Sequence, residues 1–132
     1  MRGLDPQKGE KMSKRILSVS YDLSLLATRQ WLLEQRGYIV TSAHGFTKAA
    51  EQCQQSDFDL FVLGHSIPCA DKLSLIKTFR ENCPAPILSL ERHGEGFVQC
   101  DFHASPDEPE KFIRVVDDIL AGREELSKQR RA

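Results

Sequence analysis

Histidine and cysteine side chains are the first residues of this sequence that could do chemistry. His65, Cys69, His93 and His103 each lie within a few residues of a short apolar run. Imidazole and thiolate are ligands that zinc and copper prefer. The sequence has no CxxC pair and no HExxH motif, however, and Cys100 stands three residues before His103, which in a regular strand sends the two to opposite faces. We therefore expect no metal site, and these four residues are its candidates if one exists.

Short apolar runs alternate with amphipathic segments from Arg15 onward. Such alternation predicts right-handed crossovers and a mostly parallel sheet, and continuously apolar strands suit a sheet covered by helices on both faces. The expected fold class is α/β, a flavodoxin-like doubly wound sheet of five parallel strands in the order 2-1-3-4-5. Strands are expected over 15–19, 38–42, 60–63 and 86–90, with a fifth near 98–104. Helices are expected over 22–36, along the apolar stripe of 46–53, and around 75–79 with an end before Pro84. The last helix is expected after a capping box of Asp107 and Glu110, with an apolar stripe over 112–119.

The chain of 132 residues has room for one domain with one core. We expect a flexible tail over residues 1–14, the domain over 15–122, and a charged helix end over 123–132. A net charge of -1 gives no attraction to nucleic acid or to an anionic membrane. No apolar run approaches the roughly 18 residues that span a bilayer, and the polar N-terminus lacks the apolar segment of a secretory signal. A cytoplasmic location with free thiols is expected.

Five stretches, in order and at nearly the right spacing, carry a family resemblance. They are RILSVSYD, EQRGYIVTSAHG, FDLFVLGHSIP, PILSL and SPDEPEKF. Together they resemble the receiver domain of bacterial response regulators, the CheY-like family, from about Arg15 to Gly122. The resemblance implies the same doubly wound fold, with its site at the C-terminal ends of the strands.

The chemistry that the resemblance implies is missing from the residues. Receivers use an aspartate as nucleophile toward phosphoryl groups and an acidic pair that holds Mg²⁺. In this sequence the acidic pair falls on Ser20 and Tyr21, and the acceptor falls on Gly64. The hydroxyl residue that ends strand four falls on Glu91, and the lysine before the late proline falls on Ser105. We expect a degenerate phosphorylation pocket that binds no Mg²⁺ and needs no cofactor.

Neighbouring carboxylates are poorly placed to substitute. Asp22 comes one residue late, where the chain turns into a helix, and Asp71 suits the cap of the third helix. Asp59 lies at the opposite end of its strand, about 16 Å from Gly64 at about 3.3 Å per residue. Glu91 adds negative charge to the pocket without the family's lysine to balance it.

The interval from Glu91 to Ser105 is shorter than the family's. After the fifth strand takes its share, it leaves room for about one helical turn. The helix that receivers carry between strands four and five, their helix four, is therefore expected to be missing or vestigial.

The expected function is that of a stand-alone pseudo-receiver in two-component signalling. It would act through phosphorylation-independent contacts with a protein partner: a histidine kinase, another receiver, or itself. Trp31 is expected in the core, and exposure would make it an interaction candidate. The alternative is a receiver-fold sensor that binds a transition metal or small ligand at the strand ends through His65, His93 and Glu91. We expect no enzyme, because no nucleophile–base pair or glycine-rich phosphate loop can be assembled.

Overall fold

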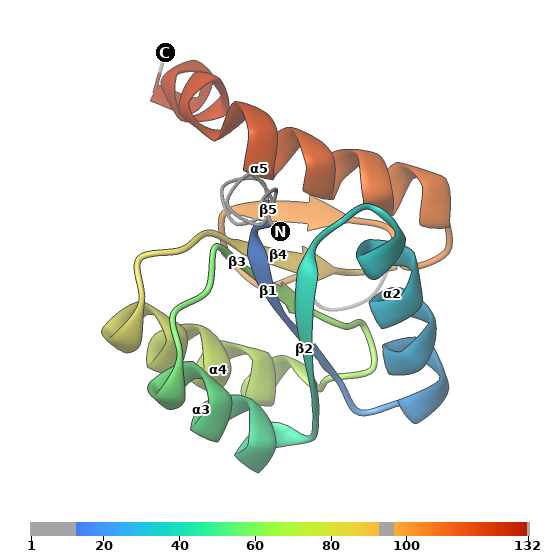
Figure 1. Cartoon of the computed structure of the whole chain (residues 1–132). Coiled ribbons are helices and arrows are strands. Elements are labelled where there is room, and N and C mark those ends of the chain that lie inside the picture. Colours follow the sequence, from blue (N-terminus) through green and yellow to red (C-terminus); the bar gives the residue numbers. More distant parts are fainter. Residues whose placement is uncertain (1–12, 93–96, 132) are drawn as a thin grey trace, which may run out of the picture.

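The computed structural model describes residues 13–92 and 97–131 of the chain. Figure 1 shows a central sheet with helices on both of its faces. Five strands make the sheet: β1 Arg15–Ser20, β2 Ile39–His44, β3 Leu60–Leu63, β4 Ile87–Leu90 and β5 Phe102–Ala104. Four helices lie in the described part: α2 Leu23–Gln35, α3 Phe46–Gln55, α4 Cys69–Asn82 and α5 Pro109–Arg131.

All strand pairs in the sheet are parallel, and the strand order is β2-β1-β3-β4-β5. The order and the alternation of strands with helices confirm the predicted doubly wound fold class. The central strands β3 and β4 are buried along their whole length, which explains why their sequences are continuously apolar. Because all five strands run the same way, their C-terminal ends meet at one edge of the sheet.

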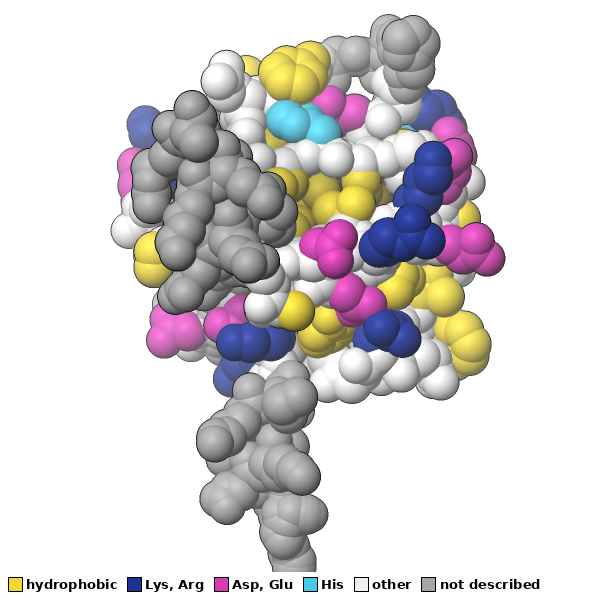
Figure 2. All heavy atoms as spheres, turned by 90° about the horizontal axis from the view of Figure 1, so that it is seen from above, with side chains coloured by type: hydrophobic (Ala, Val, Ile, Leu, Met, Phe, Trp, Pro, Cys, Tyr) yellow, Lys and Arg dark blue, Asp and Glu magenta, His cyan; other side chains and the backbone are white. Residues whose placement is uncertain are grey.

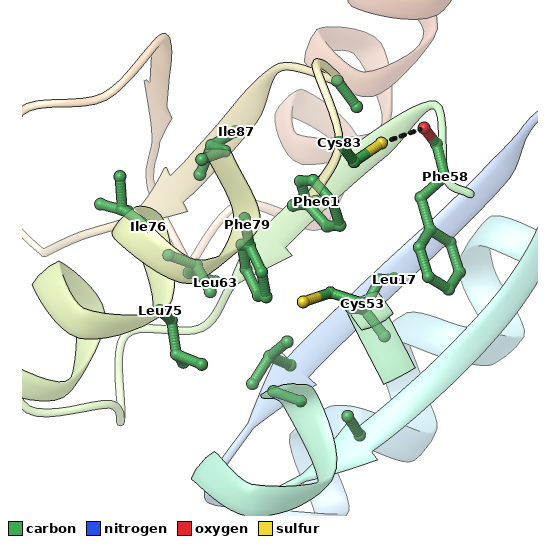
Figure 3. Packing of buried hydrophobic residues seen from close by; sticks show 14 of the residues in the cluster. Leu17, Cys53, Phe58, Phe61, Leu63, Leu75, Ile76, Phe79, Cys83 and Ile87 are labelled. Carbon is green, nitrogen blue, oxygen red and sulfur yellow. Dashed lines mark hydrogen bonds between the residues drawn. The ribbon is translucent and has the colours of Figure 1, made fainter. Parts of the chain in front are cut away.

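The core has two layers, one on each face of the sheet. On one face, residues of β1, β3 and β4 pack against α3 and α4, and Phe61 stacks on Phe79 with ring centroids 4.2 Å apart. Figure 3 shows this layer, including the Cys83 thiol, which donates to the carbonyl oxygen of Phe58 at 3.3 Å. On the other face, Leu33 of α2 and Val116 of α5 lie in a second buried cluster.

Local signals in the sequence set the ends of α2. Asp22 is its N-cap, because the carboxylate accepts from the backbone N–H of Leu25 at 3.1 Å. Past the C-terminal end, Gly37 has a φ of +93°, a left-handed conformation that favours glycine. The helix therefore begins and ends where the sequence predicts.

The helix labelled α4 lies between β3 and β4, so it is not the receiver helix that we expected to be missing. Between β4 and β5 the described residues, 91–92 and 97–101, contain no helix. Residues 93–96 lie outside the described part of the chain, and the absence of that helix stays a prediction. The expected tail is also outside it, apart from residues 13 and 14. Within α5, Gly122 departs from helical φ and ψ angles, at the predicted domain boundary.

Two placements in the sequence analysis were wrong. Asp71 does not cap α4: the helix begins at Cys69 after Pro68, and Asp71 lies inside its first turn. Trp31 is not in the core, because 61% of its surface is exposed. No helix in the described ranges is long and apolar enough to cross a membrane.

Candidate functional site: the strand ends and two buried cations

The C-terminal ends of β1 and β3 form the centre of the candidate site. The backbone N–H of Gly64 donates to the carbonyl oxygen of Val19 at 2.9 Å, which extends the pairing of the two strands by one residue. Ser66 then closes the loop over this end: its hydroxyl oxygen lies 3.3 Å from that of Ser20 and accepts from the N–H of Tyr21 at 3.1 Å. The predicted positions Ser20, Tyr21 and Gly64 are thus brought together.

The other two predicted positions follow the neighbouring strands at the same edge. Glu91 comes directly after β4, and its N–H donates to the carbonyl oxygen of Ala104, the last residue of β5, at 3.0 Å. Ser105 comes next, and its hydroxyl accepts from the N–H of Asp107 at 3.1 Å. All five degenerate positions therefore lie at one edge of the sheet, as the resemblance implies.

A guanidinium group fills the space next to Gly64. Arg29 of α2 is 5% exposed, and its Nη1 atom lies 2.9 Å from the place where a Cβ atom at residue 64 would be. Neither Nη1 nor Nη2 has a hydrogen-bond partner. Burial lowers the pKa of Arg29, and the nearby Asp22 carboxylate opposes this effect. The tip of a cation thus lies where a side chain at residue 64 would begin.

A second buried cation, Lys72 of α4, lies near the end of β4. Its ammonium group donates to the hydroxyl of Ser89 at 2.8 Å and to the carbonyl oxygen of Leu90 at 2.9 Å. It also lies 4.0 Å from Oε2 of Glu91. The expectation that Glu91 lacks a balancing lysine was wrong, because Lys72 approaches from a different element than the family's lysine would.

Glu91 is held by several groups at once. Its Oε2 atom accepts from the hydroxyl of Ser89 at 2.9 Å and from the N–H of Val98 at 3.1 Å. Only 11% of the side chain is exposed. Glu91 therefore joins α4 to the connection between β4 and β5, and its carboxylate is already engaged within the protein.

The acidic residues near the strand ends are engaged elsewhere. Asp71 accepts from the phenol of Tyr21 at 2.8 Å, and burial together with this bond raises the pKa of Tyr21 to about 12. Asp22 caps α2. Asp59 accepts from the N–H of Arg15 at 2.8 Å, which places it at the opposite end of the sheet, as expected. Each of these three carboxylates is therefore already bonded within the described part of the chain.

The metal candidates do not converge in the described residues. No group of three or more His, Cys, Asp or Glu side chains there could hold a metal ion. His65 follows β3, Cys69 begins α4 and His103 lies on β5, whereas His93 falls outside the described residues.

Cys100 and His103, by contrast, do come together. Their Sγ and Nε2 atoms are 3.6 Å apart, because Cys100 precedes β5 and the strand rule that separated them does not apply. The Nε2 atom also lies 2.8 Å from the carbonyl oxygen of Val98, which requires it to be the donor. It cannot then take a proton from the thiol, and burial raises the pKa of Cys100. This pair is not an activated nucleophile.

Sequence reasoning missed both buried cations, although a signal was present. Arg29 falls between Leu26 and Leu33 on the buried stripe of α2, and Lys72 falls three residues before Leu75 on that of α4. A basic residue on the buried stripe of a helix either extends its charged end into solvent or keeps it inside the protein. Helical periodicity alone cannot say which, because that depends on the groups that other strands place opposite.

Comparison with solved structures agrees with this geometry. The chain aligns with a CheY-like response regulator receiver domain protein from Methanospirillum hungatei with a TM-score of 0.74 and 19% identity, over 86% of this chain and 98% of that one. The fold is that of a response-regulator receiver. A similar match is the structure of histidine kinase ThkA in complex with response regulator protein TrrA, with a TM-score of 0.69, 19% identity, and 82% and 99% of the two chains covered.

Sequence comparison finds relatives among curated proteins. The alkaline phosphatase synthesis transcriptional regulatory protein PhoP of Bacillus subtilis is 29% identical over 118 residues, which are 83% of this chain and 49% of PhoP. This chain spans about half the length of the curated relatives it matches. No protein-family model matches the sequence.

Proposed function

We propose that this chain is a pseudo-receiver of two-component signalling that acts through protein contacts and not through phosphoryl transfer to an aspartate. The observation that carries the proposal is the pair formed by Gly64 and Arg29. A receiver's acceptor position here has no nucleophile, and the tip of a buried cation lies in the space of its side chain. The degenerate pocket supports no enzymatic activity in this proposal, and Mg²⁺ has no role in it.

The residues around the pocket support the same proposal. Phosphoryl transfer needs a nucleophile and a metal ion held by oxygen ligands. Ser20 and Tyr21 offer a hydroxyl and a phenol in place of the acidic pair, and the phenol is bonded to Asp71. Lys72 is bonded to Ser89 and Leu90 near the end of β4 and is 3% exposed. The groups that would perform the transfer are therefore replaced or engaged.

A phosphodonor assay tests this proposal directly. The chain is incubated with phosphoramidate and Mg²⁺ and its intact mass is measured, beside a receiver that has the full acidic set. We expect no change for this chain and a gain of about 80 Da, one phosphoryl group, for the control. A stoichiometric gain of that mass on this chain, lost at alkaline pH as an acyl phosphate is, would overturn the proposal.

The outer face of α2 is the surface that we propose for partner contact. Leu23 and Trp31 are 63% and 61% exposed, and the exposed Ala27 lies between them at a spacing of four residues. The face seen from above in Figure 2 differs, since acidic and basic side chains are mixed there with hydrophobic ones. An apolar stripe on a helix suits a helical partner. A histidine kinase is the proposed class, since one structure of this fold holds such a kinase.

Trp31→Ala tests the surface, and Leu73→Ala is a matched control because Leu73 is a similarly exposed apolar residue on α4. Purified kinases that carry a helical phosphotransfer domain are titrated against each variant. Trp31 is the only tryptophan, so its fluorescence reports on its own burial in the wild-type complex. We expect binding to weaken at least tenfold in Trp31→Ala and to be unchanged in Leu73→Ala. Equal binding by both variants would remove α2 from the proposal.

A further inference from the structure

The Arg29 guanidinium is a buried charge whose two terminal nitrogens have no hydrogen-bond partner, although the Asp22 carboxylate is near enough to act on it. Among the described residues, the buried side-chain nitrogen and oxygen atoms that lack a hydrogen bond are Nη1 and Nη2 of Arg29 and Oγ of Ser18. Buried polar groups are bonded in the great majority of cases, and a buried charge left alone is destabilising by several kcal/mol. Arginine also stays protonated at neutral pH even when burial lowers its pKa. The fold therefore holds a buried positive charge to which an anion would bind favourably.

The position of this charge is defined by what is missing at residue 64. A Cβ atom there would lie 2.9 Å from Nη1 of Arg29, 3.1 Å from the carbonyl oxygen of Val19 and 3.4 Å from Cβ of Ser20. The guanidinium tip thus occupies the space in which any other residue would begin its side chain. Because the tip is the end of a long flexible side chain, it can draw back and leave this space to a ligand.

The unpartnered oxygen lies on the same side of the sheet. Side chains alternate along a strand, so Ser18 and Ser20 share one face of β1. Ile16 shares that face too, and it belongs to the buried cluster under α2 and α5. The three atoms without partners are therefore all on the α2 side, near the ends of β1 and β3.

The chemistry of the unpartnered nitrogens selects the ligand. Nη1 and Nη2 form one edge of a planar fork, which matches the two oxygens of a carboxylate. We propose that Arg29 and Gly64 together form a binding site for a small carboxylate, of which formate and acetate are the simplest. Acetate has the composition of an aspartate side chain cut free from its backbone, so it restores the group that residue 64 lacks. Val19 and Ser20 border the position closely and exclude larger acids.

A titration of thermal stability tests the site. The full chain is melted in sodium formate or sodium acetate from 0 to about 100 mM, with sodium chloride keeping the ionic strength constant. Binding to the folded chain alone raises Tm by about 4 °C at ten times the dissociation constant. We expect a saturable rise with formate and acetate, a smaller one with propionate and none with benzoate. A rise that is linear in concentration and equal for all four acids would mean an adventitious additive only, and would overturn the proposal.

Variants separate the site from general effects of salt. Arg29→Met removes the fork, and the response to acetate should disappear. Arg36→Met, at the exposed C-cap that follows the same helix, should keep it. Gly64→Asp supplies the carboxylate from the chain itself and should also abolish the response.

Line broadening of ¹³C-labelled formate in the presence of the wild-type chain but not of Arg29→Met provides a second readout at constant temperature. An unchanged response in Arg29→Met would assign the effect elsewhere and sink the proposal.

The site shares its pocket with the proposed function, but the two can fail separately. If acetate has no effect while the phosphodonor leaves the mass unchanged, only the carboxylate site is lost. If the mass rises while acetate binds, only the proposed function is lost. Phosphoramidate is the donor of choice because it releases no carboxylate.

Discussion

Two cations are buried near the strand ends of this protein, one on each face of the sheet, and their surroundings differ sharply. Lys72 reaches inward from α4 and bonds to Ser89 and Leu90, with Glu91 nearby. Arg29 reaches inward from α2 and bonds to nothing through its two terminal nitrogens. Both side chains are at most 5% exposed, so solvent cannot account for the difference.

The difference separates a structural ion from an available one. A buried ion that is fully bonded is tied to the fold, and removing it exposes its partners to an apolar environment. A buried ion without partners destabilises the folded state, and an anion that binds to it stabilises that state. On this comparison Lys72 holds the domain together, whereas Arg29 is the group through which a ligand could act.

The largest expected effect is that of Lys72→Met. The change leaves the Glu91 carboxylate buried without its cation and the Ser89 hydroxyl without one partner. We expect the free energy of unfolding in urea to fall by about 3 kcal/mol. Lys77→Met, an exposed lysine on the same helix, should change it by less than about 0.5 kcal/mol. A Lys72→Met protein as stable as the wild type would mean that Lys72, like Arg29, does not stabilise the fold.

Arg29→Met should act in the opposite direction. Methionine fills a similar volume without charge, so we expect the free energy of unfolding to rise by about 1–2 kcal/mol in buffer free of carboxylates. Arg29→Gln removes the charge but leaves polar atoms without hydrogen bonds, so its free energy of unfolding should rise less than that of Arg29→Met. Urea titrations in a chloride-only buffer measure both variants. A clear loss of stability in Arg29→Met would mean that the guanidinium has partners after all.

Tyr21→Phe sharpens the comparison on the α4 side. The phenol donates to Asp71 and ties the end of β1 to the first turn of α4. Loss of this bond should lower the free energy of unfolding by about 1 kcal/mol at pH 7. Asp71→Asn should have a similar effect, and the double variant should cost little more than either single one. Full additivity of the two changes would show that they do not share a bond.

The smallest predicted effect is a pH dependence from the same tyrosine. The folded chain holds the Tyr21 proton up to a pKa of about 12, whereas the pKa of a free tyrosine side chain is 10.0. The unfolded chain therefore releases this proton first, and the stability that it provides is complete below pH 10 and lost between pH 10 and 12. The wild type should weaken more steeply than Tyr21→Phe over that interval. If the free energy of unfolding, measured by denaturant titration, falls equally with pH in the two proteins, the raised pKa of Tyr21 is contradicted.

Much of the fold could be predicted from particular residues. The apolar run of β3 was placed to the residue, because a strand buried on both faces needs unbroken hydrophobicity. The ends of α2 followed from Asp22 and Gly37, whose roles depend on local backbone geometry. The order of the strands also fixes that the five predicted pocket positions share one edge of the sheet, while their role as a degenerate pocket stays a prediction.

Local patterns failed where the answer depended on distant partners. Cys100 and His103 were assigned to opposite faces on the assumption of a regular strand, and a bend before β5 brings them together. Trp31 was placed in the core by residue type, but 61% of its surface is exposed in the described part of the chain. Asp71 was predicted to cap α4, but its carboxylate accepts a hydrogen bond from Tyr21, which lies 50 residues earlier in the sequence.

The sequence by itself determined the sheet and its strand order, because periodicity and residue identity are local properties of the chain. Only the tertiary structure decided that Lys72 is neutralised beside Glu91 and that Arg29 is left alone beside Gly64. The physical reason is that the free energy of a buried charge depends on the groups within a few ångströms of it. In this fold those groups come from elements far away in the sequence.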